Sequence, residues 1–281
     1  MVNSTETNWT THSTQNGTII GSFEGEPQNE LTPTVLLPGI GANAESLKRL
    51  ASELHILGHN VITADTGAAY SSMGYFRKSL GHAWTMSDFG RLLFDAVDEE
   101  FDNRPINVVG HSWGGIFAQD IASGDPGRVE RLVLMATPPG GNPNPAPSPS
   151  VIWEMLQPDR SRGRLRSVAG KLYGGDFRDK PQLVDELGMA HDVDSLAYMR
   201  QHTAALACAA SGLTNRIKHI KAPTVVIAGT DDPIIPHQNA VALSGRIPGS
   251  SLHILEDGGH MFPMSRAKET AEIIDGHLRS T

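Results

Sequence analysis

Short, mostly apolar runs alternate with longer amphipathic stretches along most of this chain. "TVLLP", "NVITAD" and "INVVG" are such runs, and "AESLKRLASELHILG" places its apolar residues at helical spacing. A strand with no polar alternation is buried on both faces. Buried strands separated by helices favour a parallel sheet with helices on both sides. We therefore predict an α/β fold built on a mostly parallel, doubly wound sheet.

The alternation is interrupted between residues 138 and 219. This segment opens with "PPGGNPNPAPSPS", whose prolines cannot continue a helix or a central strand. Helix-like pieces follow, and strand–helix alternation resumes at "APTVVIAGTDDPIIP". We predict a core formed by residues 18–137 and 220–281, with residues 138–219 inserted as a helical cap, called the cap segment below. The polar residues 1–17 are predicted to form a flexible arm.

The composition indicates which kinds of binding partner and which cellular compartment to expect. A formal net charge of −8, with no cluster of Lys and Arg that relieves it, argues against a nucleic-acid partner. No apolar run is long enough to span a bilayer, and the start lacks the pattern of a signal peptide. The single cysteine, Cys208, lies in an apolar run and is predicted to be a buried structural thiol. These features favour a cytoplasmic protein.

The pentapeptide "GHSWG", residues 110–114, stands between a predicted strand and a predicted helix. In a Gly-x-Ser-x-Gly turn the serine backbone is strained, and its hydroxyl is lifted above the carboxyl edge of the sheet. Larger residues two positions away would clash there. The N-terminus of the following helix directs backbone N–H groups at any negative charge that develops. We predict that Ser112 is a nucleophile.

A serine hydroxyl needs a base and a carboxylate that orients the base. Asp231 and Asp232 follow an apolar strand, and His260 follows the last one. The carboxyl ends of parallel strands meet at one edge, so these groups should converge on Ser112. We assign Asp232 as the acid because the Pro233 ring holds the preceding residue extended. Asp231 is the alternative, and is otherwise a solvated turn residue.

An oxyanion formed on a substrate needs two donors. The backbone N–H groups of Trp113, directly after the serine, and Ile40, in the glycine-rich loop "PGIGAN", are the candidates. Candidate substrate-binding side chains are those of Trp113, Tyr70, Trp153 and Met261. No phosphate-binding glycine pattern and no paired metal-ligand motif is present, so we expect neither a cofactor nor a metal.

Two interpretations stay open for the apolar residues of the cap segment. Trp153, Met155 and Leu156, together with Tyr173 and Phe177, either form an apolar surface over a lipid-like substrate or pack the interior of the cap itself.

Ser112, Asp232 and His260 in this order and setting resemble the alpha/beta-hydrolase superfamily over residues 34–278. Several stretches are similar to the intracellular poly(3-hydroxyalkanoate) depolymerases that act on medium-chain polyesters. That resemblance implies a cofactor-free ester hydrolase that uses an acyl-enzyme, with Ser112 as nucleophile, Asp232 as acid and His260 as base. The similar stretches are "GIGAN" (39–43), "SWGG" (112–115), "YGGDFR" (173–178), "AGTDDPIIP" (228–236), "RIP" (246–248) and "DGGHMF" (257–262).

Two departures from the resemblance leave other activities open. His111 stands where a small apolar residue is expected from those depolymerases, and "TGAAYSSMGYF" (66–76) replaces a more usual loop at the mouth of the site. The alternatives are a lipase or esterase on small or lipid esters, a carbon–carbon bond hydrolase or perhydrolase with the same triad, and a receptor that does not turn over. The expected partner is a small or polymeric ester, with association to a hydrophobic granule or lipid surface.

Overall fold

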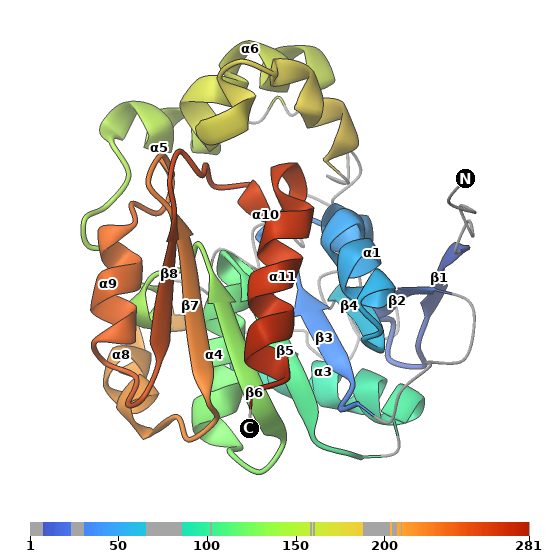
Figure 1. Ribbon diagram of the computed structural model, residues 1–281. Coiled ribbons are helices and arrows are strands. Elements are labelled where there is room, and N and C mark those ends of the chain that lie inside the picture. Colours follow the sequence, from blue (N-terminus) through green and yellow to red (C-terminus); the bar gives the residue numbers. More distant parts are fainter. Residues whose placement is uncertain are drawn as a thin grey trace.

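The computed structural model describes residues 8–23, 31–65, 86–101, 103–157, 159, 161–187, 203, 207–208 and 210–280. An eight-stranded sheet forms the centre of the molecule (Figure 1). All neighbours from β4 to β8 are parallel, whereas β2 pairs antiparallel with both β1 and β4. The predicted, mostly parallel α/β fold is therefore confirmed. In spatial order the strands are β1 (Trp9–Ser13), β2 (Ile19–Phe23), β4 (Val61–Asp65), β3 (Thr34–Leu37), β5 (Ile106–His111), β6 (Val129–Met135), β7 (Thr224–Gly229) and β8 (Ser251–Leu255).

Helices cover both faces of the sheet, and two separate apolar clusters fill the space beneath them (Figure 1). Consecutive residues of one strand enter opposite clusters: Val35 belongs to one, Leu36 to the other and Leu37 to the first again. This alternation explains why the central strands are apolar at most positions and lack a regular polar alternation. The covering helices are α1 (Lys48–Ile56), which follows the short helix η1 (Ala44–Leu47), α3 (Met86–Phe101), α4 (Trp113–Gly124), α9 (Gln238–Ser244), α10 (Phe262–Ser265) and α11 (Ala267–Leu278).

The prediction of a flexible arm over residues 1–17 is wrong for Trp9–Ser13, which form the edge strand β1. The Trp9 ring packs edge-on against Phe23 at 4.8 Å, and its Nε1 donates to Glu45 Oε1 at 2.6 Å. It also lies over Gly21, where a Cβ would come within 2.3 Å of the ring. The strand escaped prediction because backbone pairing and one tryptophan hold it, while its other side chains are exposed and polar.

Helices α5 and α6 of the cap segment lie over the carboxyl edge of the sheet, whereas its helix α8 lies beside the core, away from that edge (Figure 1). Every regular element in its described part is a helix. A third apolar cluster joins α5 and α6 to Ile234, Met261 and Met264 of the core. Leu213 and Ile217, near the end of the segment, are fully buried against the core instead. The helices are η3 (Pro139–Gly141), α5 (Pro149–Leu156), α6 (Arg162–Tyr173), η4 (Gly175–Phe177), η5 (Pro181–Glu186), α8 (Leu213–Arg216) and η6 (Ile217–His219).

Cys208 is buried, as predicted, and burial raises the pKa of its thiol to about 12. Within the described ranges, no helix is both long and apolar enough to cross a bilayer. In the same part of the chain, no three His, Cys, Asp or Glu side chains gather as a metal site would require.

Candidate active site

Ser112 lies in a sharp turn between β5 and α4. Its φ of 55° and ψ of −117° place it in a region that side-chain-bearing residues rarely adopt. The flanking glycines make this turn possible. A Cβ on Gly110 would lie 2.5 Å from the carbonyl oxygen of Gly114, and a Cβ on Gly114 would lie 2.2 Å from that of Leu37. Only glycine therefore allows the helix to start so close to the strands.

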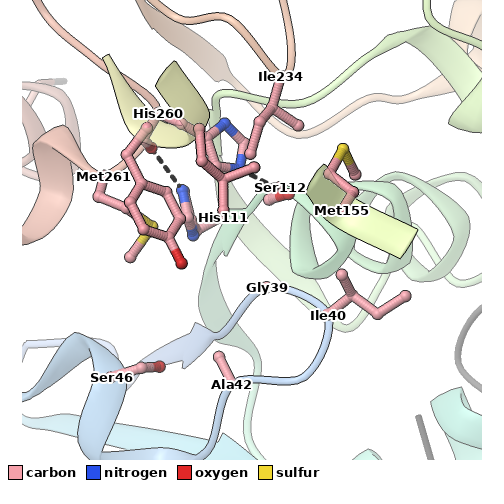
Figure 2. Close-up of a pocket in the computed structure, with 12 residues that line it drawn as sticks. Gly39, Ile40, Ala42, Ser46, His111, Ser112, Met155, Ile234, His260 and Met261 are labelled. Carbon is pink, nitrogen blue, oxygen red and sulfur yellow. Dashed lines mark hydrogen bonds between the residues drawn. The ribbon is translucent and has the colours of Figure 1, made fainter. Parts of the chain in front are cut away.

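Three strand ends bring Ser112, Asp232 and His260 together. His260 Nε2 lies 3.1 Å from Ser112 Oγ, and Figure 2 shows this contact as a dashed line. His260 Nδ1 lies 2.8 Å from Asp232 Oδ2. Ser112 follows β5, Asp232 follows β7 and His260 follows β8, so the carboxyl edge of the sheet assembles residues that are far apart in the chain.

The Asp232 carboxylate is held on both oxygens. Its Oδ1 accepts backbone N–H groups from Ile234 at 2.9 Å and Ile235 at 2.8 Å, while Oδ2 faces His260. The side chain is fully buried. Since an ionised carboxylate can only accept, His260 Nδ1 carries the hydrogen and Nε2 turns its lone pair to Ser112.

Asp231 turns away from His260. Its carboxylate forms a bidentate ion pair with Arg178 and also accepts the N–H of Gly175 at 2.6 Å. The Arg178 guanidinium holds the pKa of this carboxyl below its usual range. The geometry thus places Asp232, and not its neighbour, behind the imidazole. Asp231 is bound to the cap segment, which corrects its interpretation as a solvated turn residue.

His111 is a buried member of this cluster. Its Nε2 donates to the backbone carbonyl of His260 at 2.9 Å, the second dashed line in Figure 2, and the two rings are 5.0 Å apart. Burial, with a smaller effect of His260, lowers the pKa of His111 to about 3. His111 is therefore neutral near pH 7. The signal in the sequence was a polar residue at the carboxyl end of a buried strand, directly before Ser112.

An open pocket of about 670 Å³, its mouth included, lies in front of Ser112 Oγ (Figure 2). Ile40 and Met261, both predicted near the substrate, line it. The loop of Ile40 approaches the turn closely, since a Cβ on Gly39 would lie 3.4 Å from Ser112 Cβ. The lining residues are Gly39, Ile40, Ala42, Ser46, His111, Ser112, Met155, Leu172, Tyr173, Ile234, His260 and Met261.

Two predicted substrate-binding side chains are absent from the described wall of this pocket. The Trp113 ring is buried against Phe89 at 5.0 Å and Phe117 at 5.8 Å, so only its backbone position remains relevant. Trp153 is 65% exposed on α5. Tyr70 lies outside the described residues.

The cap residues divide between the two interpretations. Met155 and Tyr173 line the pocket, whereas Phe177 is fully buried in the cap cluster. Leu156, like Trp153, is exposed.

A parallel sheet with a serine in a glycine-flanked turn, an acid after β7 and a histidine after β8 defines the alpha/beta hydrolase class. The sequence profile described as "Alpha/beta hydrolase family" matches residues 34–273, and the chain belongs to this family.

Among curated proteins, the chain is 34% identical to a poly(3-hydroxyalkanoate) depolymerase from Ectopseudomonas oleovorans, over 89% of this chain and 84% of that protein. It is 27% identical to a 2-hydroxy-6-oxononadienedioate/2-hydroxy-6-oxononatrienedioate hydrolase from Cupriavidus pinatubonensis, over 83% and 82% of the two chains.

Solved structures share the fold at lower identity. A meta-cleavage product hydrolase from Pseudomonas fluorescens IP01 matches with a TM-score of 0.70 and 18% identity, covering 94% of this chain and 95% of that one. A putative lipase from Acinetobacter baumannii AYE matches with a TM-score of 0.70 and 20% identity, covering 96% and 91%.

Proposed function

We propose that this chain is a serine hydrolase that cleaves carboxylic esters through an acyl-enzyme intermediate. The continuous line of contacts from Asp232 through His260 to Ser112, opening into a pocket, is the observation that carries the proposal. A serine hydroxyl becomes a useful nucleophile when a neutral imidazole accepts its proton.

In the first half-reaction, Ser112 Oγ attacks the ester carbonyl carbon while His260 Nε2 takes the hydroxyl proton. Asp232 stabilises the imidazolium that results. The carbonyl oxygen becomes an oxyanion, which we assign to the backbone N–H groups of Ile40 and Trp113. His260 then gives the proton to the leaving alkoxide oxygen, and the alcohol departs.

In the second half-reaction, water replaces the alcohol. His260 takes a proton from water as its oxygen attacks the acyl carbon, and returns the proton to Ser112 Oγ when the intermediate collapses. The products are a carboxylic acid and the free serine. Each step uses residues of this chain alone.

The proposed substrate is an aliphatic hydroxyalkanoate polyester or its oligomers. The 34% identical relative, which carries the name of such a depolymerase, supports this class. The pocket wall is largely apolar, with Met155, Leu172 and Tyr173 on the cap side and Ile234 and Met261 on the core side. Such a wall suits an alkyl side chain of the acyl unit.

We also propose that α5 contacts the hydrophobic surface of a polyester granule. Trp153 and Leu156 are 65% and 68% exposed there, on the helix that also supplies Met155 to the pocket. Trp153→Ala should reduce binding to a polyester suspension several-fold and leave hydrolysis of a soluble ester unchanged. Equal binding of both proteins would contradict this part of the proposal.

Carbon–carbon bond hydrolysis is the second candidate, because a 27% identical relative is named for a dienedioate substrate. A dioate carries two carboxylates, which Arg or Lys would normally receive. The residues lining the pocket, as far as the structure describes it, include neither. This favours the ester.

One comparison of substrates tests the choice. We expect hydrolysis of p-nitrophenyl esters, from acetate to palmitate, to peak at medium chains, with clearing of a medium-chain polyester suspension. Ser112→Ala is the control and should remove both. Activity confined to the acetate ester, or to vinylogous diketones, would contradict the proposed substrate.

A further inference from the structure

The turn after α6, residues 173–178 or "YGGDFR", contacts both loops that carry the candidate acid and base. The Tyr173 carbonyl accepts the backbone N–H of His260 at 2.7 Å. Gly174 and Gly175 have φ of 64° and 50°. A Cβ on Gly174 would lie 1.9 Å from the Asp231 carbonyl oxygen, and one on Gly175 would lie 2.4 Å from the Gly259 nitrogen. The turn therefore approaches both loops at backbone distance.

One ion pair joins the turn to the acid loop. Arg178 Nε and Nη2 donate to the two Asp231 carboxylate oxygens at 2.5 and 2.6 Å, and the Gly175 N–H donates to one of them at 2.6 Å. The Asp231 N–H in turn donates to the Gly258 carbonyl at 2.9 Å, two residues before His260. Asp231 is thereby bound on three sides, next in the chain to Asp232.

A second ion pair, with its charges reversed, joins the turn to the base loop. Asp176 Oδ2 accepts from Arg266 Nε at 3.2 Å and from Ser265 Oγ at 3.0 Å. Arg266 also donates to the carbonyls of Glu256 at 2.7 Å and Asp257 at 3.0 Å. The cap thus contributes a cation to one loop and an anion to the other.

We propose that Arg178 and Asp176 are positioning residues, which hold Asp232 and His260 in line with Ser112 by binding the loops beside them. The proposal rests on the proposed function, and it assigns a role to "YGGDFR" in the same reaction. Neither residue lines the described pocket. The exposed pair of Arg178 and Asp231 adds little to global stability, whereas misplacing a reacting group by about 1 Å can cost on the order of 100-fold in rate. The two effects can therefore be separated.

The test measures kcat, KM and the rate of fluorophosphonate labelling for Arg178→Ala, Asp231→Asn, their combination and Arg178→Lys. We expect Arg178→Ala to lower kcat and the labelling rate about 10- to 100-fold, with KM within about twofold. The double variant should have a kcat no lower than that of Arg178→Ala, because both substitutions remove the same ion pair. Arg178→Lys keeps the positive charge but lacks the two parallel N–H donors of the guanidinium, so its kcat should lie between those of Arg178→Ala and the wild type.

Arg166→Ala is the matched control. Arg166 forms a bidentate ion pair with Asp185, is as exposed as Arg178, and joins α6 to η5 within the cap. Its removal should leave kcat unchanged. A purely structural role would instead give equal losses in both variants, tracking their melting temperatures, and would overturn the proposal.

Labelling separates this proposal from the function on which it rests. If the wild type labels at Ser112 and Arg178→Ala labels at the same rate, the positioning role is wrong and the hydrolase stands. If the wild type neither labels nor hydrolyses any ester, the proposed function is wrong and the positioning role falls with it.

Discussion

The two walls of the pocket differ in the bonds that hold them. The core wall presents Ser112, His111 and His260, each fixed by hydrogen bonds to strand ends and loops (Figure 2). The cap wall presents Met155 and Leu172, which belong to or pack against the apolar cap cluster and line the pocket with carbon and sulfur. We therefore propose that the core wall supplies the reacting groups and that the apolar side chains of the cap wall contribute to the fit of the substrate. Changes in these lining residues of the cap should alter the substrate and leave the chemistry unchanged, unlike changes in the positioning residues Arg178 and Asp176.

The sharpest test of this division is Ser112→Ala. If the core wall carries the chemistry, this change should lower kcat for a soluble ester by about 10⁴-fold or more, because it removes the hydroxyl that lies at His260 Nε2. Steady-state rates with a p-nitrophenyl ester measure it. A variant that keeps even a tenth of the activity would place the nucleophile elsewhere.

The neighbouring aspartates provide a comparison within the core wall. Asp232→Asn should lower kcat by about 10³- to 10⁴-fold, since an amide can donate to His260 Nδ1 and favours the wrong tautomer. Asp231→Asn, which only weakens the pair with Arg178, should cost at least tenfold less. Both are compared at saturating ester. The reverse ranking would exchange the two assignments.

The buried His111 in the core wall makes the stability of the protein depend on pH. Its pKa is lowered from 6.5 to about 3 in the folded state, so the unfolded chain binds the extra proton between these values. The contribution of His111 to the free energy of unfolding is complete above pH 6.5. It is lost as pH falls toward 3, with a slope of about 1.4 kcal/mol per pH unit. His111→Gln, which does not titrate, should lack this component. Urea unfolding at several pH values measures how the free energy of unfolding changes with pH in each protein. Identical slopes for the wild type and His111→Gln would contradict the lowered pKa of His111.

Met155 provides the smallest expected effect and tests the cap wall. Met155→Ala should lower kcat/KM for medium-chain esters about tenfold and leave the acetate ester unchanged, because it removes apolar contact with the chain. Leu156→Ala, on the same helix but 68% exposed, is the control and should change neither. A uniform loss over all chain lengths would show that Met155 acts on the chemistry instead.

The parts predicted from the sequence are those that local rules determine. The glycines around Ser112 indicate a turn that only glycine permits. The order of the parallel strands predicts that Asp232 and His260 meet at the same edge of the sheet. The parts that were missed depend on distant partners. Arg178 is far from Asp231 in the chain, and β1 depends on Trp9 reaching Phe23 and Glu45.

Side-chain direction on helices was the other source of error. Trp153 and Met155 are two residues apart on α5, and only Met155 reaches the pocket. Residues at this spacing face different sides of a helix, and the sequence does not state which side a cap helix turns inward. Trp113 was misassigned for the same reason, because its ring turns into the interior beneath α4.

The central claim is that Ser112 is a nucleophile activated by His260 and Asp232. Intact-mass and peptide-mapping spectrometry after reaction with a fluorophosphonate tests it most directly. The account predicts one adduct per chain, on Ser112, that is absent from Ser112→Ala and forms far more slowly in Asp232→Asn. An adduct on another residue, or no adduct on the folded wild type, would contradict it.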